Sequence, residues 1–304
     1  MQKQKHKFIG VEISPKIKGT IFVLICTMLW ALIPVVAKLG QANLDSHQFL
    51  FWSSLVSFIV LSITATFTGK IIEVKHYSIK DWIYILLLGL LGTYIYYLFL
   101  YFGYSKAVGL EVLVIQYTWP IFVIVLSIFI LKESLTLNKT AAITLGFIGV
   151  ITVLTKGDFK NINVENSWVI ALVIAGALCA ALFSVLSKNI KKDPIVVVSI
   201  YFLSACIASF FSMLSFSDLT VPSTAELFPI LINGILVNGY SYLFWLIALK
   251  STEASYLAPF IFIAPILSAI YLVLFFNEPA LPAYGIGLIC VVTGGIVNSI
   301  GHIR

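Results

Sequence analysis

A segment that occurs twice constrains this chain more than any other feature. Pro120 is followed by Glu133, and Pro265 is followed by Glu278, with the same spacing and within long apolar stretches. The two copies lie 145 residues apart, which is nearly half of the 304-residue chain. The same offset relates further residues of the two halves, namely Gly89, Tyr97, Leu98, Phe99 and Gly149 to Gly234, Tyr242, Leu243, Phe244 and Gly294. The pattern predicts one structural module written twice.

The composition places this module in a membrane. The chain is 60% hydrophobic and 11% charged, with a mean hydropathy of +1.05, so it holds more apolar surface than a soluble domain of this size buries. Polar residues divide it into ten apolar stretches, and most have the roughly 18–25 residues that suit a hydrocarbon core of about 30 Å. We therefore predict an all-α membrane protein with ten transmembrane helices, arranged as two five-helix repeats around a central cavity. The expected spans are 19–37, 48–68, 82–104, 112–131, 140–155, 168–187, 195–216, 227–249, 255–276 and 281–300.

The basic residues indicate which side of the membrane each loop faces. With the N-terminus inside, 15 of the 19 lysine and arginine residues fall on the inner face and 4 on the outer face. Because positive charge favours the cytoplasmic side, we expect both termini in the cytoplasm and the protein in a bacterial inner membrane. Five spans per half then make the second repeat inverted, as in many secondary transporters. The expected parts are a basic cytoplasmic segment (1–18), a first repeat (19–156), an external linker (157–166) and a second repeat (167–304).

Charged residues are missing from the middle of every predicted span. A charge at the bilayer centre costs about 2.5–3.5 kcal/mol, so transporters keep one where a substrate or ion requires it. Its absence argues against a central carboxylate that binds an organic cation or a proton. Lys38, Lys106 and Glu111 lie near the outer ends of spans and are candidates for a gate or coupling group. Snorkelling lysines and a carboxylate aligned with a helix dipole are the alternative.

Aromatic and amide residues at mid-depth form the candidate binding surface. Those of the third and eighth spans recur on one face at helical spacing. Gln116 lies four residues before Pro120, whose missing N–H frees the Gln116 carbonyl. The arrangement favours a small, mostly apolar or zwitterionic metabolite, and ordinary helix packing is the alternative. The candidate substrate-binding residues are Trp30, Tyr94, Tyr97, Gln116, Tyr117, Trp119, Asn238, Tyr242 and Trp245.

The duplicated prolines and glutamates have structural interpretations. Pro120 and Pro265 are candidate hinges between two open states, or else static kinks. Glu133 and Glu278 follow the ends of their helices. We expect them to hold loops or pair with neighbours rather than contact a substrate.

The residues of a membrane enzyme or a metal centre are not found. The four histidines lie in termini or loops without an H-E-x-x-H pattern, and the four cysteines show no metal or disulfide spacing. His76 and Asp81 match the bare H-x-x-x-x-D spacing of some acyltransferases, but the lysines beside them indicate a solvated loop. We expect no catalytic residue, no metal and no cofactor. The net charge of +6 reflects the sorted lysines and does not indicate a nucleic-acid partner.

Several segments resemble a known family over nearly the whole chain. Trp30 with Lys38, the stretch from Pro120 to Glu133 and its duplicate from Pro265 to Pro279 are similar to the ten-helix, EamA-type branch of the drug/metabolite transporter superfamily. This resemblance implies cytoplasmic termini, a basket-like bundle around a central cavity, and export of a small metabolite without ATP.

One branch of that superfamily is more similar still. The segment 111–120 (EVLVIQYTWP) resembles the E-V-x-x-x-N-Y-x-W-P segment of the bacterial aromatic amino acid exporters, as do 239–245 and 265–269. The chain departs from those exporters at Gln116, where they have Asn, and at Leu246, where an Asn follows the Trp. These departures concern the specificity for the amino acid.

The sequence therefore predicts a secondary or facilitative transporter that moves small metabolites, above all amino acids, out of the cytoplasm by alternating access. Uptake or exchange by the same fold is the alternative, because gradients set the direction. A non-transporting membrane scaffold or a lipid-handling enzyme is the alternative of a different class. The expected partners are the lipid bilayer and a small-molecule substrate such as an amino acid, with the protein as a monomer or homodimer.

Overall fold

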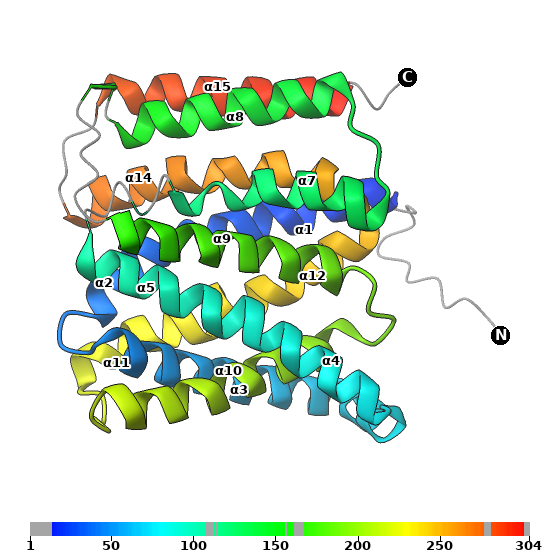
Figure 1. Ribbon diagram of the computed structural model, residues 1–304, viewed down its shortest axis with the longest axis vertical. Coiled ribbons are helices and arrows are strands. Elements are labelled where there is room, and N and C mark those ends of the chain that lie inside the picture. Colours follow the sequence, from blue (N-terminus) through cyan, green and yellow to red (C-terminus); the bar gives the residue numbers. More distant parts are fainter. Residues whose placement is uncertain are drawn as a thin grey trace.

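The computed structural model describes residues 14–107, 112, 115–155, 157–160, 167–276 and 281–300. These residues form helices, turns and loops without a β-strand, and the long helices lie side by side in one bundle (Figure 1). The first half contains α1 (Pro15–Trp30), α2 (Ile33–Gly40), α3 (Ser46–Phe67), the 3-10 helix η1 (Lys70–His76), α4 (Ile79–Gly89), the π-helix η2 (Leu90–Ile95), α5 (Tyr96–Lys106), α7 (Trp119–Leu131) and α8 (Leu137–Leu154). The second half contains α9 (Ser167–Ser187), α10 (Pro194–Phe216), α11 (Thr224–Leu231), the π-helix η3 (Ile232–Tyr240), α12 (Ser241–Ser251), α13 (Ala254–Leu257), the 3-10 helix η4 (Ala258–Phe262), α14 (Ile263–Phe276) and α15 (Pro282–Ile300).

Length and composition make this a multi-pass membrane protein, as the hydropathy predicts. Seven continuous helical stretches in the described chain are long and apolar enough to cross a bilayer, and three shorter apolar helices fall within the other predicted spans. The seven are Pro15–Gly40, Ser46–Phe67, Ile79–Lys106, Ser167–Ser187, Pro194–Phe216, Thr224–Ser251 and Ala254–Phe275. The three shorter helices are Trp119–Leu131, Leu137–Thr152 and Gly285–Gly294.

The third and eighth predicted spans have the same local structure. α4 begins with a capping box in which Ser78 and Asp81 each accept a backbone N–H from the other residue. α11 begins with the same device, made by Ser223 and Glu226, 145 residues later. Both spans then pass through a π-helical segment, η2 or η3, before they continue as α5 or α12. The duplication in the sequence therefore extends to the backbone.

Two pairs of corresponding helices pack against each other and run antiparallel (Figure 1). His47 is near the start of α3, and its Nδ1 atom lies 3.1 Å from Oγ of Ser212, which is near the end of α10. Asn138, near the start of α8, donates through Nδ2 to the carbonyl of Val297 near the end of α15 at 3.0 Å. Helices that correspond by the 145-residue offset thus point in opposite directions.

Glycine permits two close helix crossings at corresponding positions. A Cβ atom on Gly89 would lie 2.6 Å from the Cα of Tyr201 on α10, and one on Gly234 would lie 2.6 Å from the Cβ of Val56 on α3. Both distances are shorter than carbon atoms tolerate. The helices therefore have to separate before either site accepts a side chain.

Gly89→Ala and Gly234→Ala are each expected to lower the free energy of unfolding by about 1–3 kcal/mol, because they overpack these crossings. Gly285→Ala on α15 is the matched control, since a Cβ there meets no atom within 4 Å and alanine suits a helix better than glycine. Thermal unfolding in detergent, followed by tryptophan fluorescence, measures the three shifts. Equal shifts in all three variants would contradict the close-crossing interpretation.

Candidate functional site

A central cavity lies between residues from both halves of the chain. Its walls come from the α1–α2 break, α5, the segment before α7, α9 and α12. The lining residues are Trp30, Ile33, Tyr96, Tyr97, Gln116, Tyr117, Trp119, Ala180, Phe183, Ser184, Tyr242 and Trp245, and none of these is charged. The free volume is about 20 Å³, which is room for about one water molecule. A metabolite therefore needs a wider cavity than this conformation provides.

Three tryptophans and a tyrosine form the frame of the cavity. The Trp30 ring lies 5.6 Å from Trp119, 5.9 Å from Tyr242 and 5.6 Å from Trp245, measured between ring centroids. Trp119 and Trp245 meet at 5.7 Å with nearly perpendicular planes. Steeply inclined rings of this kind set the positive edge of one against the negative face of the next. The frame suits a flat or apolar part of a ligand.

The polar groups of the cavity differ in whether the protein satisfies them. Trp245 Nε1 donates to Ser184 Oγ at 3.0 Å, whereas Trp30 Nε1 is buried and finds no acceptor in the described chain. Gln116 Nε2 donates to the Tyr96 hydroxyl at 2.8 Å, and Gln116 Oε1 accepts from the Tyr104 hydroxyl at 3.1 Å. The indole N–H of Trp30 is therefore a buried donor without an acceptor among the described residues.

Helix breaks surround the cavity. α1 ends at Trp30, and Pro34 in the first turn of α2 offers no N–H to the Trp30 carbonyl. The neighbouring Ala31 carbonyl accepts from Ser268 Oγ of α14 at 2.9 Å. Pro120 likewise stands in the first turn of α7, directly after a turn. Broken helices expose backbone polarity at mid-membrane, which is where transporters place their binding sites.

Seven of the nine predicted binding residues line this cavity, and Tyr94 and Asn238 do not. Tyr94 lies in η2 and is half-buried, and Asn238 lies in η3 and is fully buried. A π-helix bonds residue i to residue i+5 and has a wider turn than an α-helix, so it rotates the residues that follow it. Spacing rules for an α-helix therefore select the wrong neighbours across both segments.

None of the other predicted site residues that the structure describes is part of the cavity lining. Lys38 and Lys106 are exposed near the ends of α2 and α5, and each makes a contact there. Pro265 occupies the first turn of α14, as Pro120 does in α7. Glu111 and Glu278 lie outside the described residues.

Sequence reasoning did not select five of the lining residues. Tyr96 follows η2 directly, so the π-helical turn brings it to the cavity beside Tyr97. Ser184 is a polar residue within the otherwise apolar α9, which is a signal that the sequence offers. Ile33, Ala180 and Phe183 are apolar residues among many in their helices, so the sequence does not single them out.

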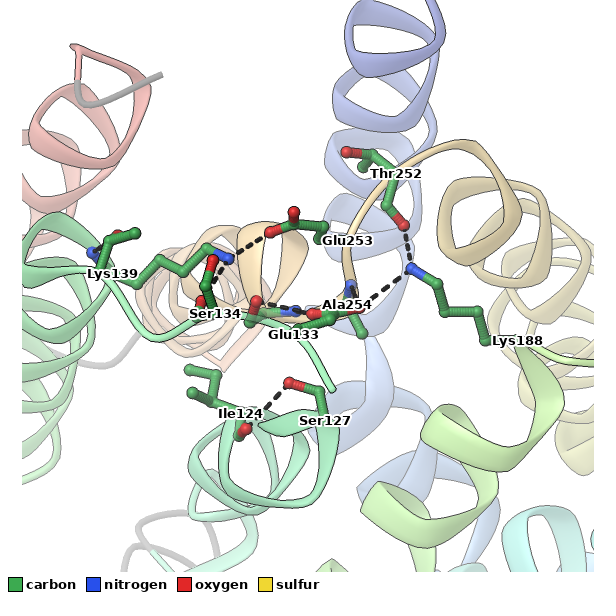
Figure 2. A network of polar contacts seen from close by, with 11 residues as sticks. Ile124, Ser127, Glu133, Ser134, Lys139, Lys188, Thr252, Glu253 and Ala254 are labelled. Carbon is green, nitrogen blue, oxygen red and sulfur yellow. Dashed lines mark hydrogen bonds and ion pairs between the residues drawn. The ribbon is translucent and has the colours of Figure 1, made fainter. Parts of the chain in front are cut away.

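A second polar site joins the two halves beyond the end of α7 (Figure 2). Lys132 adopts a left-handed conformation with φ of 56°, which ends α7 before Glu133. The Glu133 carboxylate accepts hydrogen bonds from the N–H groups of Ala254 at 2.9 Å and Ser255 at 3.0 Å, and from the Ser255 hydroxyl at 2.7 Å. It also pairs with Lys188 Nζ at 3.2 Å, and it is 7% exposed. We call Glu133, Lys188, Ala254 and Ser255 the Glu133 network.

The Glu133 network caps a helix that belongs to the other half of the chain. The first N–H groups of a helix need acceptors, and the residue before the helix usually supplies one. Glu253 precedes α13 but makes no such bond, and its side chain pairs with the buried Lys139 instead. Lys188 also donates to the Thr252 carbonyl. Glu133 thus supplies the anion that the start of α13 requires.

The network keeps the Glu133 carboxyl ionised. Burial by itself raises the pKa of Glu133, but hydrogen bonds from Ser255 and Ala254 and the charge of Lys188 outweigh burial and hold the pKa below its ordinary value of 4.5. The carboxylate is therefore charged at neutral pH.

A multi-pass helical protein with an uncharged aromatic cavity at its helix breaks has the architecture of a membrane transporter. The model of the EamA-like transporter family matches this chain twice, at residues 17–155 and 167–300. The chain belongs to this family. The predictions of family and of a transporter rather than an enzyme are thereby confirmed.

Similar proteins include transporters with different named substrates. An S-adenosylmethionine uptake transporter of Rickettsia prowazekii is 27% identical over 58% of this chain and 58% of its own length. The aromatic amino acid exporter YddG of Ancylobacter novellus is 25% identical over 68% of this chain and 72% of its own. A crystal structure with 19% sequence identity matches with a TM-score of 0.82, covering 93% of this chain and 96% of the other, so the two share a fold.

Proposed function

We propose that the protein exports amino acids or related small metabolites across a bacterial inner membrane by alternating access. The observation that carries this proposal is the small aromatic cavity, to which both halves of the chain contribute. The tryptophan frame takes the apolar part of the substrate, and the Trp30 N–H takes an acceptor group. The uncharged lining favours a substrate without net charge, such as a zwitterionic amino acid.

Two inverted five-helix repeats, residues 19–156 and 167–304, are the proposed moving parts. The antiparallel contacts of α3 with α10 and of α8 with α15 support the inversion. Repeats related by an axis along the membrane normal would keep corresponding helices parallel, whereas an axis in the membrane plane reverses them. The apolar stretches support ten spans, and the distribution of basic residues supports cytoplasmic termini.

The Glu133 network is the proposed closing contact at the cytoplasmic end. It ties the end of α7 to the start of α13 and, through Lys188, to the end of α9. A transporter that opens to the cytoplasm has to separate its halves at that end. The network stabilises the closed form until the substrate has been released on the other side.

Counterflow in proteoliposomes tests the proposed function. Purified protein is reconstituted and loaded with unlabelled solutes from a panel of amino acids and nucleosides, and uptake of the labelled solute is measured with and without a pH gradient. At least one amino acid is expected to exchange, at a rate that the pH gradient does not change, because none of the lining residues that the structure describes is a carboxylate. No exchange of any solute would refute the proposal. A strong response to the pH gradient would show that transport is coupled to protons, against this expectation.

Uptake is the second candidate, because one similar protein is an S-adenosylmethionine uptake transporter. That substrate carries a sulfonium charge, which an uncharged lining does not compensate. Including it in the panel, and comparing right-side-out with inside-out vesicles, separates the two candidates. Faster exchange of S-adenosylmethionine than of every amino acid would favour uptake.

A further inference from the structure

Two buried asparagines lie beside the central cavity without the hydrogen bonds that their burial demands. Asn233 and Asn238 both have 0% exposure and stand five residues apart in η3. Because a π-helix joins residues i and i+5, its turns stack these two side chains on one side of the span. Asn233 Oδ1 and both polar atoms of Asn238 make no hydrogen bond within the described chain. Buried polar groups are normally satisfied, so these atoms need an explanation.

Tyr101 connects the asparagines to the cavity. Asn233 Nδ2 donates to the Tyr101 hydroxyl at 3.0 Å, and Asn238 approaches the same hydroxyl without forming a hydrogen bond of good geometry. The Tyr101 ring packs on Tyr97, with centroids 5.4 Å apart, and Tyr97 lines the cavity. The Tyr97 ring is therefore the wall between the cavity and the two amides.

The facing helix adds further polar groups without partners. On α3, Phe49 packs against Tyr101 at 5.2 Å, and the Ser57 hydroxyl donates to the Gly234 carbonyl at 2.7 Å. Ser53 lies one turn from each of these residues and on the same face, so it stands opposite η3. The Ser53 and Ser54 hydroxyls are buried and make no hydrogen bond among the described residues. We call Asn233, Asn238, Tyr101 and Ser53 the amide cluster.

The first repeat shows that a π-helical segment here does not require amides. The residues that correspond to Asn233 and Asn238 by the 145-residue offset are Leu88 and Thr93. Thr93 Oγ1 is satisfied, lying 2.6 Å from the Gly89 carbonyl oxygen and 3.0 Å from that of Tyr201. Leu88 lies in α4 just before η2, and Thr93 lies in η2, so the equivalent stretch of the first repeat packs with an apolar residue and a satisfied hydroxyl. Packing alone does not explain the amides of the second repeat.

The chemistry of the amide cluster indicates what it binds. Its unused groups comprise two carbonyl acceptors, an amide donor and hydroxyls that both donate and accept, and none of them is charged. A bare cation would face the amide hydrogens, and a bare anion would face the carbonyl oxygens. A group that donates and accepts at once, and carries no net charge, satisfies both sets of atoms.

We propose that the amide cluster is a second subsite that binds the paired ammonium and carboxylate of a zwitterionic amino acid, while the tryptophan frame holds its side chain. This inference rests on the proposed function. It identifies the paired ammonium and carboxylate as the feature by which the substrate class is recognised. Movement of the Tyr97 ring opens the amide cluster to the cavity and admits the head group.

Substrate analogues test this subsite. The amino acid with the highest counterflow, chosen from L-tryptophan, L-phenylalanine, L-leucine and L-threonine, is compared with its amine, which lacks the carboxylate, and with its acid, which lacks the ammonium. The wild type is expected to prefer the amino acid, measured by competition. Asn238→Leu is expected to weaken the competition by the amino acid by about 10- to 100-fold, which is the usual loss for hydrogen bonds to charged groups. The affinity of Asn238→Leu for the amine and the acid is expected to change less than its affinity for the amino acid.

Thermal stability separates a binding role from a structural one. Asn238→Leu removes unpartnered buried polar atoms, so the unfolding temperature is expected to stay the same or rise. Thr93→Val is the matched control in the first repeat, because it removes a satisfied hydroxyl. It is expected to lower the unfolding temperature and leave the preference for the amino acid unchanged.

The outcomes distinguish this inference from the proposed function. If the wild type exchanges no amino acid, the subsite inference and the proposed function are both refuted. If the wild type exchanges an amino acid but Asn238→Leu keeps the full preference for the zwitterion, the subsite inference is refuted and the proposed function is not. A lower unfolding temperature with unchanged preference would make the amide cluster a structural element and would also overturn the inference.

Discussion

Glu133→Ala is expected to lower the free energy of unfolding by about 3 kcal/mol, because it removes the shared acceptor of four donors. The N–H groups of Ala254 and Ser255 lose their charged acceptor, and Lys188 loses its counter-ion in a site where it is 22% exposed. Breaking one partner of a buried pair costs more than the pair contributes, because the other groups stay desolvated. Thermal or denaturant unfolding in detergent measures the loss.

Glu73→Gln is the matched control for this substitution. Glu73 also pairs with a lysine, Lys70, at 3.5 Å, but both side chains are at least 40% exposed. An exposed pair of this kind contributes less than about 1 kcal/mol. Similar losses for Glu133→Ala and Glu73→Gln would show that the Glu133 network is not the strong contact that its burial implies.

The pH dependence of Glu133→Gln provides an independent check. The folded-state pKa of Glu133 lies below its ordinary value of 4.5, so the carboxylate contributes its full stability above that value. The contribution is lost as the pH falls through the folded-state pKa. The difference in unfolding temperature between the wild type and Glu133→Gln is therefore expected to be constant near neutral pH and to shrink below about pH 4.5. A constant difference throughout the acid range would contradict this assignment.

The fold could be predicted where hydropathy extended over a whole span and where the pattern recurred in the second half of the chain. The 145-residue offset predicts that corresponding helices start and end together, and Ile79–Lys106 and Thr224–Ser251 obey it at both ends. Their caps also correspond, because Ser78 and Ser223 occupy equivalent positions. Hydropathy over about twenty residues averages out local irregularities, so it locates spans well.

The candidate site followed less completely, for two physical reasons. A π-helical turn changes the face of a helix without changing its hydropathy, so Tyr96 enters the cavity while Tyr94 and Asn238 do not. Pairings across the chain leave no local pattern either. Neither Lys188 nor Ser255 carries a signal that identifies Glu133 as its partner.

Trp30→Phe is expected to raise the KM of counterflow for the transported amino acid by about three- to tenfold, with a smaller loss of stability than Trp245→Phe. The indole N–H of Trp30 has no acceptor in the described protein, so the substitution removes a donor that we propose the substrate uses. A hydrogen bond between uncharged groups contributes about 0.5–1.5 kcal/mol, and 1.4 kcal/mol corresponds to tenfold in affinity. Concentration-dependent counterflow measures the effect.

Trp245→Phe is the matched control, because it removes the same atoms from the same aromatic frame. The Trp245 N–H already donates to Ser184, so its loss is expected to cost about 1 kcal/mol of stability and to change KM by less than about threefold. The two variants therefore have opposite signatures, one in affinity and one in stability. Equal increases in KM would mean that the shape of the frame, and not the free donor of Trp30, determines binding. In that case the polar recognition of the substrate would rest on other groups, and the amide cluster beyond Tyr97 would be the next to test.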